Sequence, residues 1–251
     1  MTRAAQREEG LGAFSLVELM VTIGLIALLG ALLLPAISRS KQKGQKIQCV
    51  GNLGQLGLGL QNFVADNHVY PTLFGGTNGD QSYGWNDQLE RGGFGISKPK
   101  RSYWTEGVWK CPSARWRPEG HSVPLGPPFW NYGYNACGVS GLNPRKQYLG
   151  LSGQPMSHAE GCAPIKESEV VVPSDMIAIG DSFDGTHVFC RGFLTYKEDF
   201  GCASSRHAGT VNVAFCDGHV ESPPLKTVFV GTNDAVLVRW NREHQPHREG
   251  S

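Results

Sequence analysis

The sequence of 251 residues lacks the short patterns that mark many enzyme and cofactor sites. It contains no Gly-x-Ser-x-Gly, no Walker phosphate loop and no His-Glu-x-x-His. Its seven cysteines include no Cys-x-x-Cys pair, so a zinc-ribbon or thioredoxin-type site has little support. The formal net charge is only +1, so no broad basic field points to nucleic acid as a partner.

What is present indicates a folded, turn-rich body. Hydrophobic residues make up 40% of the chain and charged residues 18%, a composition that does not suggest disorder. Fourteen of the 15 prolines lie after residue 70, together with 24 of the 33 glycines, which favours short extended segments joined by turns over a helical bundle in that part of the chain.

The N-terminal region holds one long apolar run, from Phe14 to Ile37. As a helix these residues would extend about 36 Å, enough to cross a hydrocarbon layer of about 30 Å. A secretory signal peptide has a shorter apolar core, and a buried core helix is rarely apolar over such a length, so the run predicts a membrane-spanning helix.

The charges around this run give an ambiguous orientation. Arg3 and Arg7 precede it, whereas four basic residues follow it: Arg39, Lys41, Lys43 and Lys46. By the positive-inside rule the C-terminal body would lie in the cytoplasm. Within the run, Glu18 is an acid with no basic residue beside it, and an intramembrane acid is by default a functional residue with a partner elsewhere.

Residues 13–19, Ala-Phe-Ser-Leu-Val-Glu-Leu, closely resemble the processing site of type IV prepilins and type II secretion pseudopilins. The resemblance implies that a prepilin peptidase cuts after Ala13, where the family usually carries Gly, and methylates the new N-terminal Phe14. Glu18 is then the fifth mature residue, and its carboxylate pairs with an N-terminal amine during assembly. Pro35 is the twenty-second, another position at which the family commonly has proline.

The same resemblance implies a topology and a set of partners. It divides the chain into a leader (1–13), a transmembrane helix (14–37), an amphipathic continuation (38–70) and an extracytoplasmic β-rich domain (71–251). The N-terminus would be cytoplasmic and the body periplasmic or extracellular, on a single-pass protein of the bacterial inner membrane. Its partners would be prepilin peptidase, other pilin or pseudopilin subunits and the inner-membrane assembly platform.

After the apolar run, hydrophobic residues recur at spacings of three and four, which predicts that the helix continues to about Asn67 with one apolar face. The glycines at 51, 54, 57 and 59 weaken a helix by up to about 1 kcal/mol each, so this half must be stabilised by packing. The residues expected on that face are Ile47, Val50, Leu53, Leu56, Leu60, Phe63 and Val64.

The rest of the chain predicts an antiparallel sheet, giving an α+β fold with a long helix packed on the sheet. Strands are expected at 168–172, at 176–179 and at 211–215. Asp217-Gly218 then predicts a hairpin with a type I′ turn, in which both central residues have positive φ.

The hairpin also resembles the H-X9-DG element of a large bacterial group of prepilin-type proteins. His207 is followed by nine residues and then Asp217-Gly218. Segments 109–112, 132–135 and 178–182 fit the same group, so the resemblance extends over most of the chain. The resemblance does not say what the element does.

Three interpretations of these polar residues remain open. The turn alone explains an aspartate at position 217, because aspartate tolerates left-handed φ and forms hydrogen bonds with the backbone. A weak calcium site would use Asp181, Asp184 and Asp217, and a tethered hydrolase would use His207 and Asp217. Neither set is complete at diagnostic spacing, so we expect no catalytic residues, no bound metal and no obligatory cofactor.

Two further features bear on function. Disulfides are permitted outside the cytoplasm, and Cys190 with Cys202 and Cys111 with Cys137 are the suggested pairs, while Cys49 in the helix is expected to stay unpaired. Five tryptophans between residues 85 and 130 fit core packing, or else a glycan-binding platform on a tethered module that never polymerises.

Overall fold

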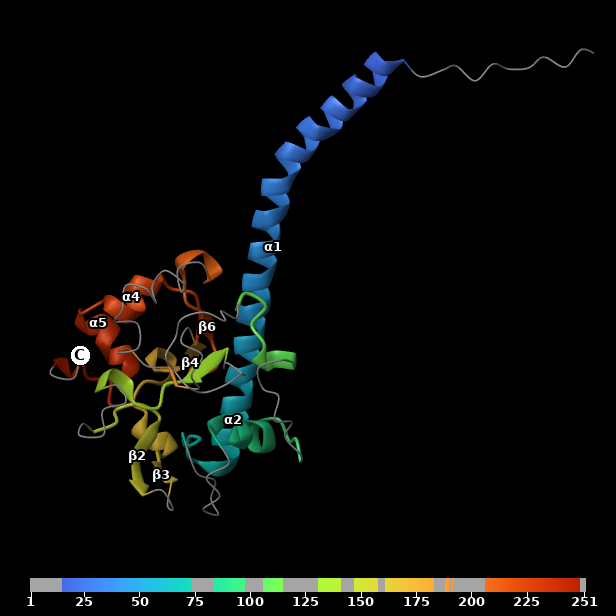
Figure 1. Ribbon diagram of the computed structural model, residues 1–251. Helices are drawn as coiled ribbons and strands as arrows, with labels where there is room; N and C mark the ends of the chain where they lie inside the picture. Colours follow the sequence, from blue (N-terminus) through green and yellow to red (C-terminus); the bar gives the residue numbers. More distant parts are fainter. Residues whose placement is uncertain are drawn as a thin grey trace, which may run out of the picture. The chain divides into compact units, whose positions relative to one another are not determined.

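The structure is a computed structural model that describes residues 15–73, 84–97, 106–114, 131–140, 147–157, 161–182, 188–189, 191 and 206–248. The chain divides into two compact units, Met1–Gln42 and Lys43–Ser251. The first unit contributes the apolar half of helix α1 (Leu16–Asn67), and the second contributes its other half together with the whole body. The helix therefore ends at the residue that the sequence predicted (Figure 1).

The body of the second unit is built around an antiparallel sheet. Its four strands lie in the order β1-β4-β5-β6, and β2 and β3 form a separate antiparallel pair. The α+β class is thus confirmed. The strands are β1 (Tyr132–Tyr134), β2 (Ser152–Ser157), β3 (Gly161–Pro164), β4 (Ile177–Asp181), β5 (Val213–Phe215) and β6 (Val220–Glu221).

Short helical segments complete the described part of the body. The regular ones are α2 (Trp85–Gln88), α4 (Leu225–Val230) and α5 (Asp234–Leu237). A π-helix covers Leu89–Gly93, and short 3-10 segments cover Gly107–Trp109, Gly138–Ser140, Glu167–Glu169, Pro173–Asp175 and Val238–Trp240. Arg206–Gly209 forms a tight turn whose two central residues have positive φ. The strand expected at 168–172 is wrong, because Glu167–Glu169 forms a 3-10 turn before Pro173.

The two faces of the sheet contribute to two hydrophobic clusters. Along β5, Ala214 belongs to the cluster that includes the buried residues of α1, while Val213 and Phe215 belong to the cluster that includes α4 and α5. This alternation is the two-residue period of a strand. The sheet is therefore covered by the second half of α1 on one face and by the C-terminal helices on the other.

The second half of α1 packs much as its pattern predicted. Leu53, Leu56, Leu60, Phe63 and Val64 are buried, whereas Ile47 is 71% exposed and does not belong to the packed face. The helix also comes close to its neighbours at glycines. A Cβ on Gly59 would lie 2.6 Å from the Phe94 ring, so a larger residue there would force that ring to shift.

Candidate functional site

The apolar half of α1 is exposed on every side. From Leu16 to Ile37 its large hydrophobic side chains are each more than half exposed, and Glu18 is its one charged residue. Among the described residues, one helix is long and apolar enough to cross a membrane, and it is α1. A core helix of a soluble protein would be mostly buried, so this exposure favours a membrane-spanning segment or a surface that packs on other protein.

Glu18 lies in the first turn of the helix. Its Oε2 accepts a hydrogen bond of 2.9 Å from the Ser15 backbone N–H, and Ser15 Oγ accepts one of 3.2 Å from the N–H of Val17. The carboxylate thus satisfies a backbone donor at the positive end of the helix dipole. Ala13 and Phe14, where processing is predicted, lie outside the described residues.

Pro35 lies inside α1, and the helix continues through it to Asn67. Proline has no N–H, so the carbonyl of Ala31 loses its intrahelical partner at this point. Its predicted role in assembly stays a prediction.

The hairpin predicted at Asp217-Gly218 is confirmed, but its turn type is not. Gly218 has φ +87°, whereas Asp217 is not among the residues with positive φ, so the turn is not type I′. The Gly218 N–H donates to Phe215 O and the Phe215 N–H to His219 O, each at 2.9 Å, which fits a turn followed by a glycine bulge. The Asp217 carboxylate accepts from the His219 N–H at 3.1 Å, as expected of a turn aspartate.

This turn packs directly on α1. A Cβ on Gly57 would lie 3.1 Å from Gly218 Cα, and one on Gly218 would lie 2.8 Å from Gln61 Oε1. The Gln61 amide also donates to the carbonyl of Asp217. The Asp-Gly part of the element therefore holds the β5–β6 hairpin on the helix.

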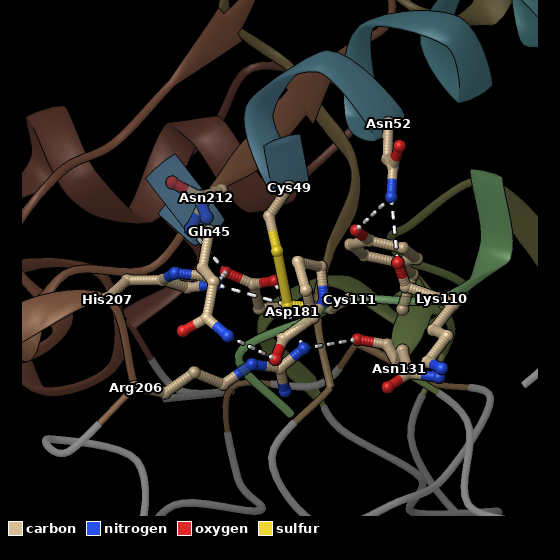
Figure 2. Close-up of a disulfide and its surroundings, with 12 residues drawn as sticks. Gln45, Cys49, Asn52, Lys110, Cys111, Asn131, Asp181, Arg206, His207 and Asn212 are labelled. Carbon is tan, nitrogen blue, oxygen red and sulfur yellow. Dashed lines mark hydrogen bonds and ion pairs between the residues drawn. A yellow bond between two sulfur atoms is a disulfide. The ribbon is translucent and has the colours of Figure 1, made fainter. Parts of the chain in front are cut away.

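The histidine of the same element lies in the interior. His207 has φ 52° and is followed by Ala208 with φ 55°, an uncommon backbone for residues other than glycine. The His207 side chain is fully buried, and its Nε2 lies 3.3 Å from Asp181 Oδ2 and 3.5 Å from Cys111 Sγ (Figure 2). The two ends of the H-X9-DG element thus have different surroundings.

Asp181 is the centre of a buried polar network at the end of β4. Its Oδ2 accepts the Asn212 N–H at 2.8 Å, and its Oδ1 lies 3.4 Å from Arg206 Nη2. Arg206 also donates to the carbonyls of Ser182 and Asn131, at 2.6 and 3.0 Å. Burial alone would raise the pKa of Asp181, but the Arg206 guanidinium, the His207 ring and the Asn212 N–H outweigh it and hold that pKa below its ordinary value.

The disulfide of this region joins Cys49 of α1 to Cys111. Both the suggested Cys111–Cys137 pair and the unpaired state of Cys49 are therefore wrong, since Cys49 faces the body rather than solvent. Asn52 and Gln45, each about one helical turn from Cys49, donate to the carbonyls of Lys110 and Pro112 at 2.8 and 3.2 Å (Figure 2). Cys190 and Cys202 lie outside the described residues.

The geometry does not favour the suggested hydrolase site, and it leaves the suggested calcium site incomplete. His207 is buried beside Asp181, whereas Asp217 bonds His219 in a partly exposed turn, so the two residues of the suggested hydrolase have separate partners. The same nitrogen, Nε2, faces both the acid and the sulfur, so His207 does not relay between them as a triad histidine does. Asp184, the third suggested calcium ligand, lies outside the described residues.

Two of the five loop tryptophans are core residues. Trp85 is fully buried, stacks on Tyr134 with ring centroids 5.3 Å apart and meets Trp109 edge-on at 5.4 Å. The Trp109 indole N–H donates to Glu90 at 2.9 Å. These two therefore pack the interior and offer no binding platform, while Trp104, Trp116 and Trp130 lie outside the described residues.

Comparison with known proteins gives one partial similarity. The chain is 36% identical over 70 residues to the type II secretion system core protein G of Escherichia coli (strain K12), a match that covers 28% of this chain and 46% of that protein. The chain thus spans about half the length of the relative that it matches. No family model and no solved structure matches. The similarity and the exposed apolar helix fit a pilin-like, membrane-anchored protein.

Proposed function

We propose that this chain is a structural subunit, processed before Phe14 and assembled through its N-terminal helix into a type IV pilus or a type II secretion pseudopilus. The observation that carries the proposal is the exposed apolar surface of Leu16–Ile37 with Glu18 as its one charge. The partial similarity to a type II secretion system core protein supports it. The chain serves as the substrate of prepilin peptidase and has no catalytic role of its own.

In the proposed assembly, the N-terminal helix lies first in the membrane and then in the polymer. In the membrane, the apolar half lies in lipid and Glu18 stays near the cytoplasmic surface, with the C-terminal body outside. In the polymer, the helices of neighbouring subunits replace the lipid, and the Glu18 carboxylate pairs with the new α-amine of Phe14 on a neighbour. That ion pair would form in a low-dielectric interior, where an unpaired carboxylate is costly.

The experiment compares two acid-to-alanine substitutions on one helix. Glu18→Ala removes the proposed assembly charge, whereas Asp66→Ala removes an exposed acid near the other end of α1. In the native bacterium, mild cross-linking and sedimentation should give polymers of the wild-type chain and of Asp66→Ala, and membrane-bound monomer for Glu18→Ala. Loss of polymer in both variants, or in neither, would contradict the proposed role of Glu18.

A wild-type chain that is found only as a monomer would favour the other candidate, a tethered binding module.

A further inference from the structure

Three metal-ligand atoms meet where α1 contacts the body. Cys49 Sγ, Cys111 Sγ and His207 Nε2 all lie within 4.8 Å of one another, and all three residues are buried. They come from three separate segments, the helix, the turn at residues 107–114 and the H-X9-DG element. We propose that the chain with Cys49 and Cys111 reduced binds one zinc-like divalent ion through these three side chains, and that the disulfide is the alternative, metal-free state of the same site.

The distances around His207 are close to those expected around a bound ion, and they also allow hydrogen bonds in its absence. On a tetrahedral zinc, a thiolate at about 2.3 Å and an imidazole nitrogen at about 2.0–2.1 Å lie about 3.5 Å apart. Cys111 Sγ lies 3.5 Å from His207 Nε2. In the metal-bound state the two sulfurs separate to about 3.7 Å, which the same bond lengths require.

Asp181 lies beside the fourth position. A nitrogen and an oxygen that are both bound to zinc lie about 3.3–3.4 Å apart, and Asp181 Oδ2 lies 3.3 Å from His207 Nε2. This separation is longer than a normal N–H···O hydrogen bond of about 2.7–3.2 Å. Asp181 therefore either completes the coordination or orients a water there.

The charges also favour an ion over free thiolates. Asp181 is already balanced by the buried Arg206. Two thiolates without an ion would add two unpaired negative charges to the interior, which is costly, whereas a divalent ion neutralises them. The disulfide is neutral as well. Besides the pair of protonated thiols, the site thus has two charge-balanced states, one with a metal and one with an S–S bond.

The ligand types select the class of metal. Thiolate sulfur with imidazole nitrogen suits zinc and related soft or borderline ions, and it does not suit calcium or magnesium, which prefer oxygen. The spacing of the ligands explains why no sequence motif marks the site: Cys49 and Cys111 are 62 residues apart, and Cys111 and His207 are 96 apart.

The exchange between the two states balances. Binding of the ion to the dithiol releases two protons, one from each thiol. In the reverse direction, a disulfide oxidant takes two electrons from the two thiolates and two protons from solvent, and it leaves as two thiols. The sulfurs of Cys49 and Cys111 then form the S–S bond, and the ion is released. In either state α1 is fixed to the turn that carries Cys111, and in the metal state it is fixed to His207 as well.

The test uses the full chain in detergent, reduced with a phosphine that forms no thiolate complex. Titration with Co²⁺ should saturate at one ion per chain, with thiolate-to-cobalt charge-transfer bands and the strong d–d absorption of a tetrahedral site. Zn²⁺ should displace the Co²⁺, and X-ray absorption of the zinc form should show two sulfur neighbours. Absence of these bands from the reduced wild-type chain, or equal binding by the oxidised chain, would overturn the proposal.

Matched variants assign the ligands. Cys49→Ser and Cys111→Ser should each abolish the charge-transfer bands of the tight site, and Asp181→Asn should weaken binding about 10–100-fold, as loss of a supporting group does. Cys162→Ser removes a buried thiol outside the cluster. The double variant Cys190→Ser/Cys202→Ser removes the two cysteines that the sequence suggests as a pair. Both control chains should keep the wild-type spectrum. Loss of the bands in a control, with the bands retained in Cys49→Ser, would place the metal elsewhere and overturn the assignment.

Discussion

Gly57 of α1 and Gly218 of the β5–β6 turn lie so close that a Cβ on Gly57 would be 3.1 Å from Gly218 Cα. That separation is tighter than ordinary van der Waals contact, and the atom it meets is backbone, which cannot rotate away. The second half of the long helix and the Asp-Gly turn therefore fit together at a position where neither residue has a side chain.

This contact predicts opposite effects for two glycines of one helix. Gly57→Ala should destabilise the body, because about 1–3 kcal/mol of overpacking exceeds the gain in helix propensity. Gly51→Ala should stabilise it by up to about 1 kcal/mol, since a Cβ there would have no neighbour within 4 Å. The measurement is guanidinium unfolding of the full chain in detergent, followed by tryptophan fluorescence. A stabilising Gly57→Ala would contradict the contact.

The disulfide should make a large contribution to stability. In the chain-entropy account, closing a loop of 62 residues stabilises a fold by about 4 kcal/mol. In metal-free buffer, Cys49→Ser should therefore lower the free energy of unfolding by that order, and adding reductant should not lower it further. Cys162→Ser, which removes a thiol outside any disulfide, should leave the reductant sensitivity at its wild-type size. If Cys49→Ser kept that sensitivity, another pair would be responsible.

The Asp181–Arg206 pair predicts a specific dependence of stability on pH. The pKa of Asp181 is lowered in the folded state, so its contribution is fully present above the unfolded pKa of about 3.9 and is lost as pH falls through the folded pKa. Asp181→Asn should flatten that acid limb. It should also cost about 3–5 kcal/mol at neutral pH, because it leaves the Arg206 charge buried without its partner.

The control for this prediction is an exposed ion pair. Asp234 bonds Arg248 through two hydrogen bonds of 2.9 Å on the surface. Asp234→Asn should cost no more than about 1 kcal/mol and should leave the acid limb unchanged. Equal losses for the two variants would show that the Asp181 network has no special role.

Local patterns in the sequence predicted the local elements well. The extent of α1 to about Asn67 followed from hydrophobic residues at spacings of three and four, and the β5–β6 hairpin followed from Asp217-Gly218 between two extended runs. One local pattern gave a wrong prediction, the strand expected at 168–172. Residues 168–172 contain adjacent valines typical of a strand, but these valines lie between two 3-10 turns, Glu167–Glu169 and Pro173–Asp175, and form no strand.

The site itself could not be read from the sequence, because it is made of long-range contacts. The sequence placed His207 and Asp217 in one element but gave no sign that His207 would meet Asp181 and Cys111 in the interior. Cys49 looked like an unpaired helix residue, since nothing nearby in the chain identifies its partner. Long-range contacts within the body bring His207 to Asp181 and Cys111, and the packing of α1 adds Cys49.

The N-terminus of the mature protein distinguishes a processed, pilin-like subunit from an unprocessed or secreted chain. The protein should be isolated from its native membrane and analysed by intact mass and N-terminal sequencing. If the chain is processed as proposed, the isolated protein begins at N-methylated Phe14 and keeps the whole of α1. A chain that still begins near Met1, or one cleaved beyond the apolar segment as a secretory signal would be, would contradict it.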